Sequence, residues 1–149
     1  MDSEVVVSAF QDDSLGSDDA IVIAEKIKQG ELDTKTVNRD AIKRAELVNP
    51  KLNAIAVKNF DFAQANSEKT FSGFFQGVPT FIKDTDEVPG LPLYLGSRSL
   101  PGEPSEKFSK AAKQIIDTGL NCLGTTTTPE FGLTGTTESL RFGATCNPW

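Results

Sequence analysis

Lys83 is the residue whose place in the sequence best suits it for catalysis. It directly follows residues 77–82, an apolar run that predicts a strand, so its ammonium group should emerge poorly solvated where that strand leaves the core. A lysine whose pKa is lowered by burial can accept a proton near neutral pH. Lysines at strand ends are more often surface residues whose stems cover apolar atoms. Position alone favours that ordinary role.

The sequence contains no histidine, which narrows the chemistry that these 149 residues can perform. Ser-His-Asp catalysis, Cys-His catalysis and histidine-ligated zinc all need an imidazole. The two cysteines, Cys122 and Cys146, are too few for a disulfide framework and lack the short paired spacing of zinc sites. An amide hydrolase built on this sequence needs another base, for which lysine is the main candidate. We expect neither a metal nor an organic cofactor.

The charge and the apolar runs indicate which partners to expect. The formal net charge is −6 and no cluster of lysine and arginine is present, which argues against a nucleic-acid module. Residues 1–4 are acidic where a secretory signal needs a positive region, and no apolar run approaches the length of a membrane span. We therefore predict a cytoplasmic protein that contacts neither nucleic acid nor a membrane.

Strands that alternate with helices predict an α/β fold, in which helices cover a sheet. The apolar spacing, N-caps and stop signals place the elements as follows. Helices are expected over 18–29, 34–48, 60–69 and 105–118, the first capped by Ser17, the second halted by Asn49-Pro50 and the last capped by Ser105; strands are expected over 54–57, 78–82 and 121–123. Pro79 suits a strand start or an edge strand. Residues 124–149 are expected to form a long loop.

The chain divides into an arm and one domain. Residues 1–16 are acidic and without apolar periodicity, and we expect a flexible arm there. Residues 17–149 are enough for one domain with a hydrophobic core. Loops that follow the carboxyl ends of strands, as residues 124–149 do, are where sites are usually built.

Three blocks of the sequence resemble the amidase-signature family, in the order that the family has them. The blocks are Gly30-Glu31-Leu32 with Asn49-Pro50-Lys51-Leu52-Asn53-Ala54; Gly77-Val78-Pro79 with Lys83-Asp84, Gly90-Leu91-Pro92 and Gly96-Ser97; and Thr128-Pro129-Glu130-Phe131-Gly132 with Gly135-Thr136-Thr137-Glu138-Ser139, Phe142-Gly143-Ala144-Thr145 and Asn147-Pro148-Trp149. One such block is weak evidence, whereas three in order are strong.

The resemblance implies a fold and a mechanism. The fold is the amino-terminal part of the amidase-signature fold, a mixed sheet flanked by helices and truncated here, with residues 17–149 forming the amino-terminal portion of a single amidase domain. The mechanism is a Ser-cisSer-Lys triad that cleaves a small-molecule carboxamide to a carboxylate and ammonia or an amine. Only Lys83 matches a catalytic position. Both serines belong to a Gly-Gly-Ser-Ser segment and the region after it, expected beyond Trp149, so these 149 residues alone are expected to be inactive. Ser97, Ser99 and Ser139 lie where the family does not place those roles.

Several other polar residues have two readings. Asp84 could orient the site, although an acid past a strand end is more often a turn or cap residue. The hydroxyls of residues 125–128 are as easily structural as functional. Glu130, Glu138 and Arg141 could form a buried ionic cluster, and a solvated face is equally plausible.

Two alternatives to a free amidase stay open. One is the glutamine-hydrolysing subunit of a tRNA-dependent amidotransferase, and the other is a non-catalytic binding or interaction domain. The resemblance also implies one continuous sheet built from strands spread over several hundred residues, of which this chain supplies only the first few. It should therefore leave uncovered sheet edges and apolar helix faces, such as that of Ile115 and Ile116. We therefore expect self-association, most simply as a homodimer, unless residues 124–149 fold back over the open face.

Overall fold

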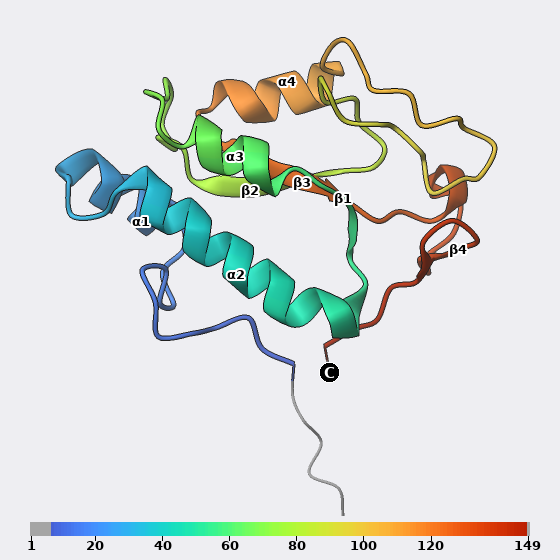
Figure 1. The fold of residues 1–149 in the computed structure, drawn as a ribbon, viewed down its shortest axis with the longest axis horizontal. Coiled ribbons are helices and arrows are strands. Elements are labelled where there is room, and N and C mark those ends of the chain that lie inside the picture. The colour runs from blue at the N-terminus through green and yellow to red at the C-terminus, as the bar shows by residue number, and fades with distance from the viewer. Residues whose placement is uncertain (1–6, 149) are drawn as a thin grey trace, which may run out of the picture.

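The computed structural model describes residues 7–148, which form a small mixed sheet flanked by helices (Figure 1). The sheet contains β1 (Ile55–Lys58), β2 (Pro79–Lys83) and β3 (Asn121–Thr126), in the spatial order β1-β3-β2. The central strand β3 runs antiparallel to β1 and parallel to β2. This is the α/β architecture that the sequence predicts. Among the described residues no helix is long and apolar enough to cross a membrane.

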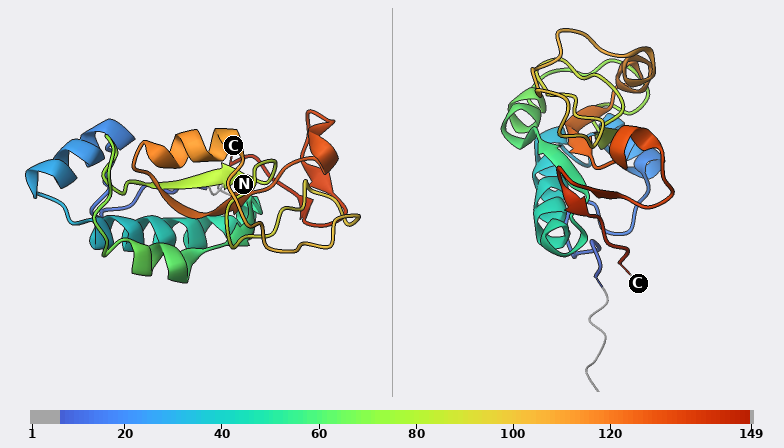
Figure 2. Two further views of the ribbon diagram at one scale, coloured as in Figure 1. Left: turned by 90° about the horizontal axis from the view of Figure 1, so that it is seen from above. Right: turned by 90° about the vertical axis from the view of Figure 1, so that its right-hand side faces the viewer.

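Helices cover both faces of the sheet. Figure 2 (left) shows α4 (Lys110–Asp117) on one side and α2 (Thr34–Leu52) with α3 (Phe60–Asn66) on the other. Two consecutive residues at the start of β3 face these two layers. Cys122 packs in the cluster of α4, whereas the side chain of Asn121 bonds to Asn38 of α2 (2.8 Å) and to the carbonyl of Ala63 in α3 (2.9 Å).

The first helix, α1 (Ala20–Gln29), begins two residues later than predicted, because the N-cap is Asp19 and not Ser17. The Asp19 carboxylate accepts the backbone N–H groups of Ile21 and Val22, both at 2.9 Å. An aspartate caps a helix as well as a serine does, so the two candidates could not be separated from the sequence.

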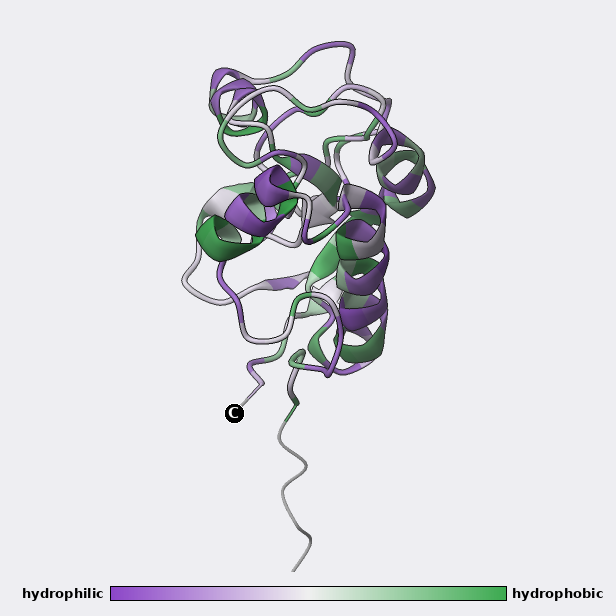
Figure 3. Cartoon of the chain, turned by 90° about the vertical axis from the view of Figure 1, so that its left-hand side faces the viewer, coloured by the Kyte–Doolittle hydropathy of each residue, from purple (hydrophilic) through white to green (hydrophobic). Residues whose placement is uncertain are grey.

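Helix α2 runs past Pro50 to Leu52, so the predicted stop at Asn49-Pro50 was wrong. Proline in a last turn removes one hydrogen bond, and here the helix is ended instead by Asn53, which is left-handed at φ 50° and donates its N–H to the Asn49 carbonyl (2.7 Å). The side-chain oxygen of Asn49 accepts the N–H groups of Ala54 and Ile55, which follow Asn53. In Figure 3, α2 mixes hydrophilic and hydrophobic positions, as an amphipathic helix does.

Helix α4 begins at Lys110 and not near Ser105, because residues 104–105 are bonded to another segment. The backbone of Ser105 donates to the Leu91 carbonyl and accepts from the Gly90 N–H, both at 2.9 Å. The N-cap is Ser109, whose hydroxyl accepts the N–H of Ala112.

The other elements differ from the prediction at their ends only. Helix α3 stops at Asn66, three residues early, and β3 extends three residues further, to Thr126. Pro79 is the first residue of β2, which is an edge strand, as its missing N–H predicts. The single loop predicted over residues 124–149, of which Trp149 lies outside the described residues, was wrong, since β3 is followed by η1 (Glu130–Gly132) and by a hairpin of β4 (Glu138–Ser139) and β5 (Gly143–Ala144).

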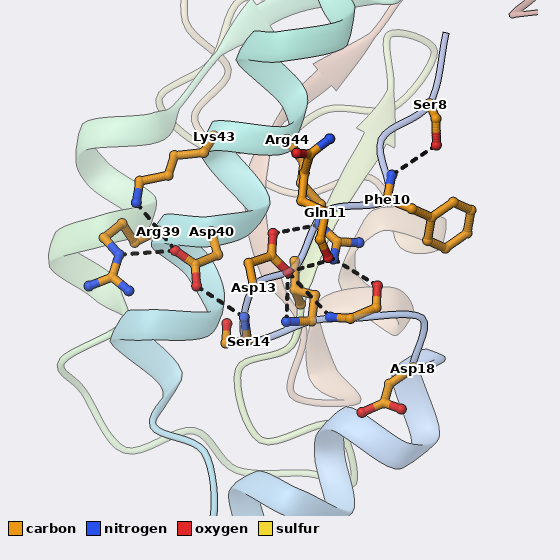
Figure 4. Close-up of polar contacts among 12 residues, drawn as sticks. Ser8, Phe10, Gln11, Asp13, Ser14, Asp18, Arg39, Asp40, Lys43 and Arg44 are labelled. Atoms are coloured by element: carbon orange, nitrogen blue, oxygen red, sulfur yellow. Dashed lines mark hydrogen bonds and ion pairs between the residues drawn. The ribbon is translucent and has the colours of Figure 1, made fainter. Parts of the chain in front are cut away.

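The segment that precedes α1 is tied to α2 by an ion pair (Figure 4). The predicted flexible arm spans residues 1–16, of which 1–6 lie outside the described residues. Within the rest, the Asp13 carboxylate accepts two hydrogen bonds from the Arg44 guanidinium, at 2.8 and 2.5 Å. Arg44 also donates to the carbonyls of Gln11 and Gly16. The bonds from Arg44 hold the pKa of Asp13 below its usual value.

Candidate active site

Lys83 is the last residue of β2 and lies at one edge of the sheet. Its neighbour on β3 is Thr126, which also ends its strand, and Thr126 pairs on its other side with Ile55 at the start of β1. The carboxyl ends of β2 and β3 and the amino end of β1 therefore lie together at one end of the sheet. We call this end of the sheet the lysine edge. The side chain of Lys83 is exposed and makes no ion pair with any residue in 7–148. The sequence predicts a poorly solvated ammonium group, but within residues 7–148 the side chain of Lys83 is exposed to solvent.

Asp84, the next residue, is completely buried and anchors the loop that follows β2. Its carboxylate accepts the backbone N–H groups of Tyr94 (2.9 Å) and Gly96 (3.0 Å), while its own N–H donates to the Thr126 carbonyl (2.9 Å). Burial raises the pKa of Asp84, and the two accepted hydrogen bonds and the charge of Arg141 oppose that shift. Of the two roles considered for Asp84, the structure favours the structural one, in which the carboxylate holds the backbone of this loop at the lysine edge.

The loop held by Asp84 packs tightly against the segment that follows β3. At Gly96 an added Cβ would lie 2.4 Å from the Thr128 carbonyl oxygen, so only glycine allows this approach. The N–H of Phe131 donates to the Leu95 carbonyl at 2.7 Å. The hydroxyl of Ser97 is 2.5 Å from a carboxylate oxygen of Glu130. The exits of β2 and β3 are thus joined by backbone and side-chain contacts.

Arg141 fastens the β4–β5 hairpin to the same loop. Its guanidinium lies over the Tyr94 ring, 3.9 Å from the centroid, and donates to the carbonyls of Ser97 (2.6 Å) and Leu100 (2.8 Å). The ionic cluster considered for Glu130, Glu138 and Arg141 is not formed, since no ion pair joins these residues in the described part of the chain. Arg141 instead binds carbonyl groups and an aromatic ring.

The serines near the lysine edge have structural partners. Ser97 shares a hydrogen bond with Ser99 (2.8 Å), and the hydroxyl of Ser139 accepts the N–H of Phe142 within the hairpin (3.1 Å). Between residues 7 and 148 no hydrogen bond connects a serine hydroxyl with Lys83.

Two threonines of the run 125–128 are buried without a hydrogen-bond partner for their hydroxyls. Thr125 and Thr128 are 1% and 0% exposed, and neither hydroxyl contacts a polar atom of the described residues. Thr127 differs, because its N–H donates to the Ala54 carbonyl and its hydroxyl meets that of Thr145 at 2.8 Å. Thr127 is therefore the member of the run that joins two segments.

Asn53 is a residue beside the site for which sequence analysis found no role beyond its place in a motif. Its side-chain amide donates to the carbonyls of Phe142 (2.6 Å) and Ala144 (3.0 Å), which lie about ninety positions away in the chain. Its carbonyl accepts the hydroxyl of Thr145 at 2.8 Å. The sequence around Asn53 gives no indication of partners so far away in the chain.

The two cysteines lie in different settings. Cys122 lies at the start of β3, where burial raises the pKa of its thiol, and Cys146 is exposed; the two thiols are free. No group of three histidine, cysteine or acidic residues within 7–148 is arranged to hold a metal ion.

Comparison with known proteins gives this arrangement a family context. The Amidase family model matches residues 37 to 149. "Putative amidase AmiC" of Mycobacterium leprae (strain TN) is 39% identical over 143 residues, which cover 96% of this chain and 31% of that protein. The matching subunit of the glutamyl-tRNA(Gln) amidotransferase of Prochlorococcus marinus (strain NATL2A) is 28% identical over 135 residues, covering 85% of this chain and 28% of the relative.

A solved structure shares the fold as well as the sequence. The 6-aminohexanoate cyclic dimer hydrolase, in complex with its substrate, superposes with a TM-score of 0.80 at 33% identity, over 89% of this chain and 28% of the hydrolase chain. The chain thus spans less than a third of the length of these relatives. Because the family model covers most of the sequence, and three ordered motifs and the mixed sheet agree with it, the chain belongs to the Amidase family.

Proposed function

We propose that this chain supplies the lysine-bearing part of a serine-dependent amide hydrolase, with Lys83 as its catalytic base. The observation that carries the proposal is the position of Lys83: its exposed side chain lies where β2 and β3 end, and the loops around it are tied by Asp84, Gly96 and Arg141. The carboxyl ends of parallel strands are where α/β proteins build their sites.

In the proposed reaction a neutral Lys83 removes the proton of a nucleophilic serine through a bridging serine hydroxyl. The serine oxygen attacks the amide carbon, and backbone N–H groups stabilise the oxyanion that forms. Collapse of this intermediate breaks the carbon–nitrogen bond, and the leaving amine takes a proton through the same relay. Water then loses a proton to the same relay and attacks the acyl-serine ester. The carbon–oxygen bond to the serine breaks, the serine oxygen takes the proton back, and the carboxylate is released. No metal or organic cofactor is needed for these steps.

The exposure of Lys83 indicates what the rest of the site must supply. General-base catalysis by a lysine is favoured by a covered, less polar setting, which the described residues do not provide at Lys83. We propose that the segment that carries the two serines also covers Lys83. The 149 residues alone, which have neither that segment nor a histidine, should then hydrolyse no amide.

The amidotransferase alternative is supported by a specific relative. The matching subunit of the glutamyl-tRNA(Gln) amidotransferase aligns over 85% of this chain, at lower identity than the amidase AmiC. Such a role would add a second protein as partner, with glutamine as the amide. A non-catalytic interaction domain is the remaining alternative, and inactivity of a longer protein that contains the Gly-Gly-Ser-Ser segment would favour it.

We also infer that the 149-residue chain associates with itself. The edge strand β2 has one neighbour in the described sheet, and Ile115 of α4 is 41% exposed. Unpaired strand edges and exposed apolar residues favour pairing with another copy.

The deciding experiment compares two strand-end lysines in a longer protein that continues into the Gly-Gly-Ser-Ser segment. Lys83→Ala should lower kcat by orders of magnitude while the fold is kept, because a general base is removed. Lys58→Ala is the matched control, since Lys58 is also an exposed lysine that ends a strand, but at the opposite edge of the sheet. Near-normal turnover of Lys83→Ala would remove Lys83 from its role.

A second measurement concerns the 149 residues alone. They should not hydrolyse a simple amide or a nitrophenyl ester above background. Turnover that disappears in Lys83→Ala would reveal a nucleophile within these residues and contradict the proposed division of the site.

A further inference from the structure

The segment formed by residues 142–146 is docked at the lysine edge by several hydrogen bonds, three of which involve Asn53. Asn53 stands between α2 and β1, and its neighbours in space include Thr127, which directly follows β3. We propose that Asn53 is a positioning residue: it ends α2 and, with its side chain, holds residues 142–146 against the strand ends beside Lys83. The catalytic meaning of this docking rests on the proposed function, whereas the docking itself does not.

The first task of Asn53 is performed by its backbone. It adopts the left-handed conformation, with φ 50° and ψ 48°, and its N–H closes the last turn of α2 on the Asn49 carbonyl at 2.7 Å. Glycine and asparagine are the residues that adopt this conformation most readily. A helix end by itself would therefore be served equally well by glycine at this position.

The second task needs the carboxamide. Both side-chain hydrogen bonds come from Nδ2, one to the Phe142 carbonyl at 2.6 Å and one to the Ala144 carbonyl at 3.0 Å. Glycine could end the helix and supply neither bond. Aspartate has nearly the same shape, but its ionised form only accepts hydrogen bonds and would place a negative charge against two carbonyl oxygens. Asparagine is the residue that satisfies both tasks.

Further bonds extend this contact to β3. The Thr145 hydroxyl donates to the Asn53 carbonyl (2.8 Å) and lies 2.8 Å from the Thr127 hydroxyl, and the Cys146 N–H donates to the Leu52 carbonyl (2.8 Å). Thr127 follows Thr126, the strand neighbour of Lys83. A continuous chain of contacts therefore runs from Asn53 to the lysine edge.

The two tasks can be separated by amide hydrogen exchange of the 149-residue chain. The reporters are the N–H groups of Thr145, bonded to the Thr137 carbonyl, and of Cys146; the reference is the N–H of Asn121, bonded to the Val78 carbonyl in the sheet. Asn53→Gly keeps the helix end and removes both donors. We expect exchange at the two reporters to accelerate about tenfold or more, with Asn121 unchanged, because the two hydrogen bonds that hold the segment are lost.

Two further variants complete the design. Asn53→Asp should accelerate the reporters at least as much as Asn53→Gly at neutral pH, and acidification below the pKa of the new carboxyl should partly restore protection, since a protonated acid can donate one bond. Thr145→Val removes one hydroxyl with little change of shape, leaves Asn53 intact, and should accelerate exchange at Cys146. If Asn53→Gly does not fold, Thr145→Val still tests the docking.

Unchanged exchange at Thr145 and Cys146 in Asn53→Gly would overturn the proposal, because that result is expected if Asn53 serves only to end the helix. In a longer, active protein, Asn53→Gly should lower kcat more than it changes KM. Normal turnover of Lys83→Ala would contradict the proposed function but would not affect the exchange result. A failure of the proposed function and a failure of the docking by Asn53 can therefore be told apart.

Discussion

Lys83 is exposed and Asp84 is completely buried, although they are adjacent in the chain. Successive side chains of a strand point to opposite sides, and β2 ends between these two residues. One side of the strand end therefore presents an amine to solvent. The other side uses a carboxylate to fix the loop that surrounds this amine.

The two neighbours should behave oppositely when they are substituted. Asp84→Ala should lower the free energy of unfolding by about 1–3 kcal/mol, because the N–H groups of Tyr94 and Gly96 lose their buried acceptor. Asp84→Asn should also be destabilising, because its carboxamide oxygen can replace only one of the two acceptors and its NH2 group would face the other N–H donor. Lys83→Met should stay within about 0.5 kcal/mol of the parent. Urea unfolding measures all three, and equal losses at both positions would contradict the separation of roles.

The tight contact between the two loops can be tested at Gly96. An added Cβ would lie 2.4 Å from the Thr128 carbonyl oxygen, so Gly96→Ala should separate the loops and lower stability. Gly90→Ala is the matched control: Gly90 also has a positive φ, +81° against +65°, but nothing lies within 4 Å of its added Cβ. Both variants carry the backbone strain, and Gly96→Ala alone carries the clash. Similar melting temperatures of the two would show that the contact is unimportant.

Stability in acid should depend on the ion pair of Asp13 and Arg44. The hydrogen bonds from Arg44 lower the pKa of Asp13 in the folded chain below its usual 3.8. The pair therefore contributes fully above pH 3.8, and the contribution is lost as the pH falls further through the folded pKa. Asp13→Asn should reduce stability at neutral pH and flatten this acid limb. Thermal unfolding from about pH 2 to 7 measures both effects, and parallel curves for the variant and the parent would exclude the linkage.

The sequence predicted the layers of the fold better than the ends of its elements. Apolar periodicity located every main helix and strand, because each buries one face. The N-caps were misplaced where two polar residues compete, as at Ser17 and Asp19, or where a tertiary bond captures the candidate, as at Ser105. The carbonyl of Leu91 that binds Ser105 could not be inferred from local pattern.

The candidate site was predictable to a smaller extent. The position of Lys83 at a strand end followed from the apolar run before it, and its exposure did not, since exposure depends on what packs around that end. The contacts of Asn53 and Arg141 join residues about 40 to 90 positions apart, and single-sequence reasoning has no means of pairing them. These contacts arise from how the loops pack, and the structure is needed to find them.

Self-association is expected to involve α4 and the open edge of β2. Ile115 is 41% exposed on α4, and β2 has no second neighbour among the described strands. Light scattering over a concentration series should show a rise in mass, and a closed dimer is the simplest product. Ile115→Glu should shift this rise to higher concentration, because a charge replaces an apolar contact. Gln114→Glu is the control, since it adds the same charge at the adjacent exposed position of the helix. A folded chain that stays strictly monomeric at high concentration and binds no hydrophobic dye would contradict the expectation.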